Sequence, residues 1–220
     1  MSHQIIIADD HPLFRAALRQ AVSQAVPEAD VIEVDSIKAL QAAVDLHPSA
    51  DLVLLDLNMP GAHGFSGLVF MRGQYPGLPV VVVSGAEEIQ VMRRAIDYGA
   101  SGFIPKSAPL PTITQAIRDV LEGDMWLPEG VAERLERVQP DSTDISDRLA
   151  SLTPQQFRVL GMLAEGLLNK QIAYDLEVSE ATVKAHITAV FRKLGVRNRT
   201  QAVIAIQQLE IDNSQTSLSG

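Results

Sequence analysis

Three carboxylates, one hydroxyl and one ammonium group stand at the ends of four β-like runs in the first half of the chain. The run "QIIIA" leads into Asp9 and Asp10, "LVLL" leads into Asp56, and two later runs end in Ser84 and Lys106. The carboxyl ends of parallel strands meet at one edge of a sheet, so these side chains converge if the runs form such a sheet. Clustered carboxylates repel one another unless a cation lies between them, and hard oxygen ligands suit Mg²⁺. The pattern therefore predicts a magnesium site.

A carboxylate beside a bound metal is also a suitable phosphoryl acceptor, forming an aspartyl-phosphate. Lys106 and Ser84 would then stabilise the charge on the transferred group. Each residue alone has a simpler explanation. Asp56 precedes the turn residues "NMPG" and fits an Asx-turn, and an aspartate pair before Pro12 fits a helix N-terminus. Only the coincidence of several strand ends favours a phosphoacceptor site.

The elements that must position these groups can be read from the hydrophobic pattern. Five β-rich runs begin at Gln4, Asp30, Leu52, Pro79 and Ser101, and segments of helical periodicity separate them. Strands that alternate with helices imply right-handed βαβ units and a parallel sheet. The third and fourth runs are apolar throughout, as expected of strands covered on both faces. For residues 1–124 we predict an α/β, flavodoxin-like, doubly wound five-stranded parallel sheet.

The second half of the chain has a different pattern. We interpret residues 125–148 as a linker that begins with a short helix and becomes flexible in its second half, which is rich in Asp, Ser, Thr and Pro. Residues 149–211 carry helical signals only, and they predict an all-α domain of four helices that contains a helix-turn-helix. Residues 212–220 are predicted to form a disordered tail.

Local signals predict where the helices of the second domain begin and end. Thr153 is placed as an N-cap, with Gln156 three residues later to complete a capping box. Gly166 is placed to end that helix. Ser179 is the expected N-cap of the third helix, which we predict to run to about Leu194.

Composition limits the classes of function. The 220-residue chain is 46% hydrophobic and contains no cysteine, so disulfides and thiolate metal sites are excluded. The N-terminus does not resemble a signal peptide, and no apolar run approaches the roughly 20 residues of a membrane span. We therefore expect a cytoplasmic protein without membrane contact.

The net charge of -9 does not exclude a nucleic-acid partner, because the acidic residues are unevenly distributed. Residues 1–124 hold 15 Asp and Glu against 8 Lys and Arg, whereas residues 150–220 hold 6 against 7. Charge per domain is the useful quantity, and the second domain is close to neutral.

Residues 1–124 resemble a response-regulator receiver domain in the ordered motifs "ADDH", "LLDLNMPG", "VVVSG" and "GASGFIPKS". The resemblance implies that Asp56 is the phosphoacceptor and that a partner histidine kinase is the phosphodonor. It also implies that Mg²⁺ is held by Asp10 directly, by Asp9 through water, by Asp56 itself and by the backbone carbonyl of Asn58.

The same resemblance implies a switch. Ser84 corresponds to the hydroxyl that moves toward the phosphoryl group, and Lys106 to the lysine that pairs with it. Phe103 corresponds to the aromatic residue that turns inward as Ser84 moves, although it is equally consistent with a simple core aromatic. One departure from the family pattern is Ser107, since many receivers have proline after the lysine.

The segment "SEATVKAHITAVFRKLG" predicts an amphipathic helix. Its apolar face consists of Val183, Ile187, Val190, Phe191 and Leu194. Basic and small residues occupy the other faces, as in the second helix of a helix-turn-helix that enters the major groove of DNA. Taken alone, the segment is more typical of a surface helix whose charges are solvated.

The longer segment from Leu152 to Val203 resembles the LuxR-type DNA-binding domain, and with the receiver the whole chain resembles a NarL/FixJ-type response regulator. The implied DNA-contacting residues are Lys184, Ala185 and Thr188 for base edges, Lys170, Thr182 and Lys193 for phosphates, and His186 for either.

Two departures from the LuxR-type pattern affect local structure. The Arg-Glu pair common in the family is replaced by Gln155 and Gln156, so a charge pair is absent. Leu168 replaces a common serine, and we expect Asn169 to take over as N-cap of the second helix.

We therefore predict a two-component response regulator that controls transcription. Phosphorylation of Asp56 is expected to govern homodimerisation and sequence-specific binding to double-stranded DNA. Beyond its own Mg²⁺-dependent phosphoryl transfer and autodephosphorylation, the chain is not expected to be an enzyme. The low positive charge of the second domain predicts that one copy binds DNA weakly.

Two alternatives remain open from the residues alone. One is a phosphatase with an aspartyl-phosphate intermediate, although Asn58 stands where such enzymes commonly place a second acid. The other is a DNA-binding protein that does not respond to phosphorylation.

Overall fold

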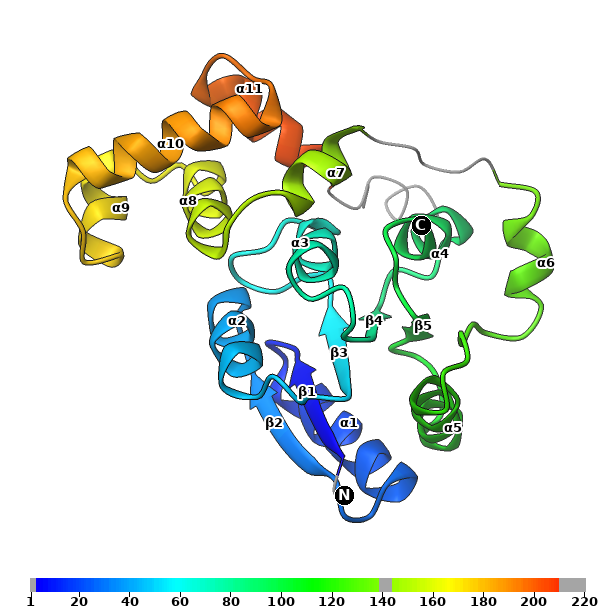
Figure 1. Ribbon diagram of the computed structural model, residues 1–220. Helices are drawn as coiled ribbons and strands as arrows, with labels where there is room; N and C mark the ends of the chain where they lie inside the picture. The colour runs from blue at the N-terminus through cyan, green and yellow to red at the C-terminus, as the bar shows by residue number, and fades with distance from the viewer. Residues whose placement is uncertain (1–2, 139–143, 210–220) are drawn as a thin grey trace, which may run out of the picture.

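Five parallel strands form one sheet in the computed structural model, which describes residues 3–138 and 144–209 (Figure 1). The strands are β1 (Gln4–Ala8), β2 (Asp30–Val34), β3 (Leu52–Asp56), β4 (Val80–Ser84) and β5 (Gly102–Pro105). Their order across the sheet is β2-β1-β3-β4-β5, and every neighbouring pair is parallel. This is the flavodoxin-like order, so the predicted fold class is confirmed.

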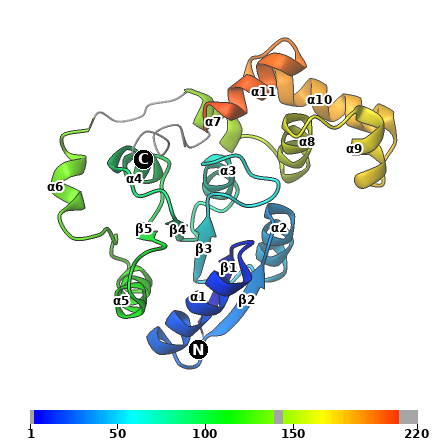
Figure 2. The same ribbon diagram turned by 180° about the vertical axis from the view of Figure 1, so that it is seen from behind.

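Helices cover both faces of the sheet (Figures 1 and 2). One face carries α1 (Pro12–Ala25) and α5 (Leu110–Leu121), and the other carries α2 (Ile37–Leu46), α3 (Ser66–Gln74) and α4 (Ile89–Asp97). Leu52 and Leu54 of β3 pack toward the first face, and Val53 and Leu55 pack toward the second. The unbroken apolar run of β3 therefore reflects burial on both sides, because successive side chains of a strand point to opposite faces.

Four helices follow in the second domain: α8 (Pro154–Ala164), α9 (Asn169–Asp175), α10 (Glu180–Leu194) and α11 (Arg199–Gln207). The predicted caps at Thr153 and Ser179 are confirmed, since the hydroxyls accept hydrogen bonds from the backbone N–H groups of Gln156 and Thr182. The predicted N-cap at Asn169 is wrong. Asn169 is already the first helical residue, and the N-cap is Leu168. In place of a side-chain cap, the Leu168 N–H donates to Oε1 of Gln171 at 2.7 Å.

The predicted linker contains two helices. The expected short helix at its start is α6 (Val131–Leu135). Its second half was predicted to be flexible, but α7 (Asp144–Ala150) occupies part of it, which corrects that prediction. Leu149 is buried in the same apolar core as α3, so tertiary packing orders a segment whose composition is typical of a loop. The predicted tail, residues 212–220, lies outside the described residues.

No helix in the described parts of the chain is long and apolar enough to cross a membrane.

The two domains share one apolar core, and we call this packing the closed arrangement. The rings of Phe70 on α3 and Phe157 on α8 stack with their centroids 4.3 Å apart. Gln74 Nε2 donates hydrogen bonds to the carbonyls of Ala150 at 3.2 Å and Leu152 at 2.7 Å. Apolar contact and backbone hydrogen bonds therefore hold α7 and α8 against α3.

The C-terminal end of α11 also contacts the first domain. The backbone N–H of Phe65 donates to the Leu209 carbonyl at 2.9 Å, and Arg94 Nη2 on α4 donates to the Gln208 carbonyl at 2.7 Å. The Arg94 guanidinium also lies 4.8 Å from the centroid of the Phe65 ring, which is a cation–π distance. The N-terminus of α3 and helix α4 therefore both contact the residues that follow α11.

The closed arrangement can be tested at Gly73, where α3 meets α7. A Cβ at this position would lie 2.6 Å from Cα of Ala150 and would also overlap its carbonyl oxygen. We expect Gly73→Ala to separate the domains while the receiver stays folded, because alanine favours the helix and only the interface loses space. Small-angle X-ray scattering should then report a larger radius of gyration.

The matched control is Gly77→Ala, because a Cβ at Gly77 would meet no heavy atom within 4 Å. Equal radii of gyration for the Gly73→Ala and Gly77→Ala variants would contradict this packing of α3 on α7.

Candidate functional site

The strand ends bring the predicted phosphoacceptor residues to one edge of the sheet. Asp9 follows β1, Asp56 ends β3, Ser84 ends β4 and Lys106 follows β5. Asp9 and Ser84 are 0% exposed, and Asp56 is 2% exposed. The parallel topology therefore places two carboxylates and a hydroxyl in a setting with little water to screen their charges.

Lys106 joins the two buried carboxylates. Its Nζ lies 2.7 Å from Oδ2 of Asp9 and 2.9 Å from Oδ2 of Asp56. Burial lowers the pKa of the Lys106 ammonium, but the hydrogen bonds to Asp9 and Asp56 outweigh burial, and the pKa lies above its ordinary value. Lys106 is therefore held in its charged form.

For Asp56, in contrast to Lys106, burial outweighs the attraction between the two groups. Burial raises the pKa of its carboxyl above the ordinary value, although the ion pair with Lys106 opposes the rise. The Asp9 carboxylate raises the pKa further, while the N–H of Asn58 lowers it. That N–H donates to Asp56 Oδ1 at 3.3 Å, so the Asx-turn proposed as the simpler explanation is present together with the acidic cluster.

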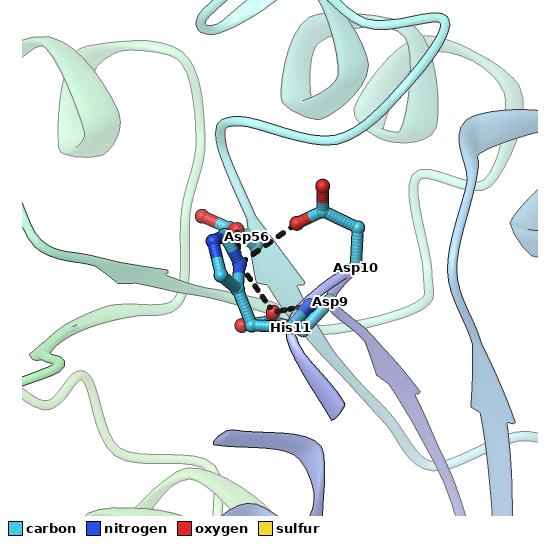
Figure 3. Close-up of side chains that lie close together, drawn as sticks. All are labelled: Asp9, Asp10, His11 and Asp56. Carbon is cyan, nitrogen blue, oxygen red and sulfur yellow. Dashed lines mark hydrogen bonds and ion pairs between the residues drawn. The ribbon is translucent and has the colours of Figure 1, made fainter. Parts of the chain in front are cut away.

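The acidic cluster has the donor set of a divalent cation site. One ligand atom from each of Asp9, Asp10, His11 and Asp56 can be chosen so that all lie within 4.8 Å of one another (Figure 3). Oδ1 of Asp10 is a buried atom without a hydrogen bond of regular geometry, although Nδ1 of His11 lies 2.8 Å away. Buried carboxylate oxygens that lack such a bond suit a hard cation, so the residues fit a metal.

A cavity of about 550 Å³ opens beside Asp56. Its lining consists of His11, Leu13, Phe14, Asp56, Asn58, Gly85 and Lys106. The Lys106 Nζ lies 4.9 Å from the centroid of the Phe14 ring. A donor group can therefore approach Asp56 from the solvent side, past the start of α1.

Sequence reasoning gave no role to His11 or Phe14. His11 belongs to the quoted motif "ADDH", and its position next to the carboxylate pair was the available signal. Phe14 had only helical periodicity to mark it, which does not distinguish a core residue from one beside a site.

The two predicted switch residues are both buried. Ser84 Oγ accepts a hydrogen bond from the backbone N–H of Ala86 at 3.1 Å. Phe103 is fully buried among the residues that face α3 and α4. The aromatic ring is therefore already inside the core in the closed arrangement.

The predicted DNA-contacting residues gather on α9 and α10. Both helices extend away from the sheet in the two views (Figures 1 and 2). Five of the residues are exposed, namely Lys170, Thr182, Lys184, Ala185 and Thr188. His186 and Lys193 are half-buried, and Lys193 Nζ donates to the Ser151 carbonyl at 2.6 Å. The predicted DNA-contacting residues therefore lie on one pair of helices, but the Lys193 side chain is hydrogen-bonded within the protein.

Family comparison finds two matching models. The one described as "Response regulator receiver domain" matches residues 5–118, and the one described as "Bacterial regulatory proteins, luxR family" matches residues 150–206. Together they include the carboxylate site and the helix-turn-helix.

Similar proteins match along almost the whole chain. The "Glycerol metabolism activator" of Pseudomonas putida is 41% identical, and the match covers 94% of this chain and 96% of that protein. The "Nitrate/nitrite response regulator protein NarP" of Escherichia coli K12 is 35% identical, with 93% and 94% covered. Among solved structures, RcsB of Salmonella enterica serovar Typhimurium, bound to promoter P1flhDC in the presence of the phosphomimetic BeF3-, is 25% identical with a TM-score of 0.56. That match covers 95% of this chain and 100% of that chain.

Because the Asp56 carboxyl is buried, we expect its ionisation to destabilise the folded protein when no metal is bound. Because the pKa of Asp56 is raised in the folded state, ionisation opposes folding at neutral pH, and this cost disappears as the pH falls and the carboxyl is protonated. We expect Asp56→Asn to raise the melting temperature by about 2 to 4 °C, equivalent to about 1 kcal/mol for a chain of this size.

Differential scanning calorimetry in a chelating buffer at neutral pH measures this change. The gain should shrink as the pH falls and the wild-type carboxyl becomes protonated, and also in saturating Mg²⁺, where a cation offsets the repulsion. A lower melting temperature for Asp56→Asn at neutral pH would contradict the claim that the ionised Asp56 carboxylate destabilises the fold.

Proposed function

The chain belongs to the response regulators that join a receiver domain to a LuxR-type DNA-binding domain and regulate transcription, and from this premise we propose that a phosphoryl group on Asp56 controls its DNA binding. The observation that carries the proposal is the setting of Asp56. It is a buried carboxylate at a strand end, 2.9 Å from the Lys106 ammonium, and it lines an open cavity.

The proposed reaction is phosphoryl transfer from a histidine kinase. A carboxylate oxygen of Asp56 attacks the phosphorus atom, the bond from phosphorus to the imidazole nitrogen of the kinase breaks, and that nitrogen regains its electron pair. The Lys106 ammonium stabilises the negative charge on the transferred group. Mg²⁺ would be held by Asp10, Asp56 and the carbonyl of Asn58 directly and by Asp9 through water, and it would supply further positive charge. Hydrolysis of the acyl phosphate later restores the carboxylate.

We infer that Ser84 couples phosphorylation of Asp56 to the contact between the receiver and the DNA-binding domain. Its hydroxyl accepts a hydrogen bond from Ala86 in the loop that leads into α4, and α4 carries Arg94, which donates to the Gln208 carbonyl. If the Ser84 side chain rotates so that its hydroxyl donates to a phosphoryl oxygen, its Oγ moves away from the Ala86 N–H and the loop must rearrange. A shift of α4 then weakens the contact with α11. The closed and open arrangements form a two-state equilibrium that phosphorylation displaces.

The opened domain is proposed to bind DNA as a homodimer. Lys184, Ala185 and Thr188 face base edges, and Lys170 and Thr182 bind phosphates. Residues 150–220 hold only one more basic than acidic residue, so the electrostatic gain of a single copy is small. Two copies on paired half-sites double the number of contacts. A DNA target also implies the cytoplasm as the working compartment.

The proposal is tested by phosphorylation with a small acyl phosphate and Mg²⁺. Operator fragments are first selected from genomic DNA by footprinting, and affinities are then measured by fluorescence anisotropy at fixed salt. Phosphorylation is expected to raise the affinity of the wild type about tenfold or more, a coupling free energy of about 1.4 kcal/mol. Asp56→Asn should show no increase.

Asp124→Asn is the control, because Asp124 is an exposed carboxylate outside the acidic cluster. It should respond as the wild type does. If Asp56→Asn bound DNA as tightly as the wild type with phosphodonor present, the protein would be a DNA-binding protein that does not respond to phosphorylation.

The DNA face is tested by comparing Lys184→Ala with Lys170→Ala. A base contact at Lys184 predicts a loss of about 1–3 kcal/mol on the selected site, and a smaller loss on unrelated DNA. A phosphate contact at Lys170 predicts a similar loss on every sequence, and a decrease of about one in the slope of log K against log salt.

Lys38→Ala, on α2 of the receiver, controls for the loss of one positive charge. If the three variants gave the same losses on both kinds of DNA, the assignment of Lys184 and Lys170 would be wrong.

A further inference from the structure

A histidine ring lies inside the acidic cluster. Nδ1 of His11 is 2.8 Å from Oδ1 of Asp10, 3.1 Å from Oδ1 of Asp9 and 3.7 Å from Oδ2 of Asp56. Figure 3 shows the ring directed toward these carboxylates, with contacts to Asp9 and Asp10. One nitrogen atom therefore lies close to three oxygens that are proposed to hold a cation.

The backbone fixes the position of His11. Its N–H donates to Oδ1 of Asp9 at 2.7 Å. The residue is the N-cap of α1, with φ -91° and ψ 105°, and Pro12 follows at the first turn. A residue before proline is restricted to extended backbone, so this conformation is imposed by the sequence. The side chain is nevertheless 62% exposed, so the ring is bound to the protein on one side only.

The distances match those between the ligands of one metal ion. Around an octahedral dication with bonds of about 2.1 Å, adjacent ligand atoms are about 3.0 Å apart and opposite ones about 4.2 Å apart. The nitrogen–oxygen distances of 3.1 and 3.7 Å lie between these two values, and the distance of 2.8 Å is about 0.2 Å below the shorter one. Nδ1 is therefore spaced from the carboxylates as a fellow ligand would be.

Lys106 leaves this position available. Its Nζ contacts Oδ2 of Asp9, whereas the backbone N–H and ring nitrogen of His11 contact Oδ1. The ammonium and the imidazole therefore do not compete for one oxygen of Asp9. A cation bound beside Oδ1 of Asp9 and Oδ1 of Asp10 would have the histidine nitrogen as its neighbour.

We propose that His11 supplies a nitrogen ligand to the cation at this site and thereby makes the site favour transition-metal dications over Mg²⁺. Imidazole nitrogen suits first-row transition metals, whereas Mg²⁺ prefers oxygen ligands and retains water. Mg²⁺ would bind through the oxygens, with water where the ring nitrogen stands. The inference rests on the proposed metal site and not on phosphorylation itself.

The test is isothermal titration calorimetry of the full chain with Co²⁺ and, separately, with Mg²⁺. His11→Ala is expected to weaken Co²⁺ binding about tenfold or more, and to leave the Mg²⁺ dissociation constant within about threefold. The visible absorption spectrum of bound Co²⁺ should also change in His11→Ala, because a nitrogen ligand is lost. Thermal melting of the metal-free variant establishes that it is folded.

His47→Ala is the matched control, since His47 is a half-buried histidine at the C-terminus of α2 and contributes nothing to the cluster. It should bind Co²⁺ as the wild type does. An unchanged Co²⁺ affinity in His11→Ala, or equal losses for both metals, would overturn the proposal.

Tighter binding of both metals to His11→Ala would also overturn it, because the ring would then be a competitor of the cation. A wild type that binds both metals but takes no phosphoryl group would refute the proposed function alone. The comparison between Co²⁺ and Mg²⁺ would remain valid in that case.

Discussion

Repulsion between carboxylates at one edge of a parallel sheet is the constraint on which this protein depends. The topology leaves no choice, because β1 and β3 are neighbours and both lead into acidic residues. One ammonium group, that of Lys106, bridges Asp9 and Asp56, but the buried Oδ1 of Asp10 still lacks a regular hydrogen bond. In the proposed reaction, a bound cation would relieve this repulsion and would also offset the negative charge of the transferred phosphoryl group.

The loop after β4 and helix α4 connect the acidic site to the domain that contains the helix-turn-helix. The loop after β4 is held at its start by the hydroxyl of Ser84, and the helix that follows carries Arg94. Arg94 contacts both an aromatic ring of the receiver and the end of α11. A small change in one buried hydrogen bond can therefore alter an interface between domains, because packed elements shift between discrete arrangements.

Sequence patterns predicted the sheet, the strand ends and most helix caps, because each depends on signals within a few residues. Parallel topology then required the carboxylates to converge. The wrong N-cap at Asn169 was a local failure, because Gln171 bonds to the Leu168 N–H instead. The other failures arose where distant contacts decide the outcome. Helix α7 is an example, because it is ordered by burial of Leu149 against α3. The position of the His11 ring depends on three carboxylates at once, which no pattern along the chain encodes.

The stacked rings of Phe70 and Phe157 make the domain interface largely apolar. Apolar burial is driven by entropy near room temperature and weakens on cooling. The hydrogen bonds of Gln74 and Arg94 do not share this dependence to the same degree. If phosphorylation opens the domains as proposed, the equilibrium between the domains responds to temperature as well, and a cold cell would need less phosphoryl transfer to open the same fraction of molecules.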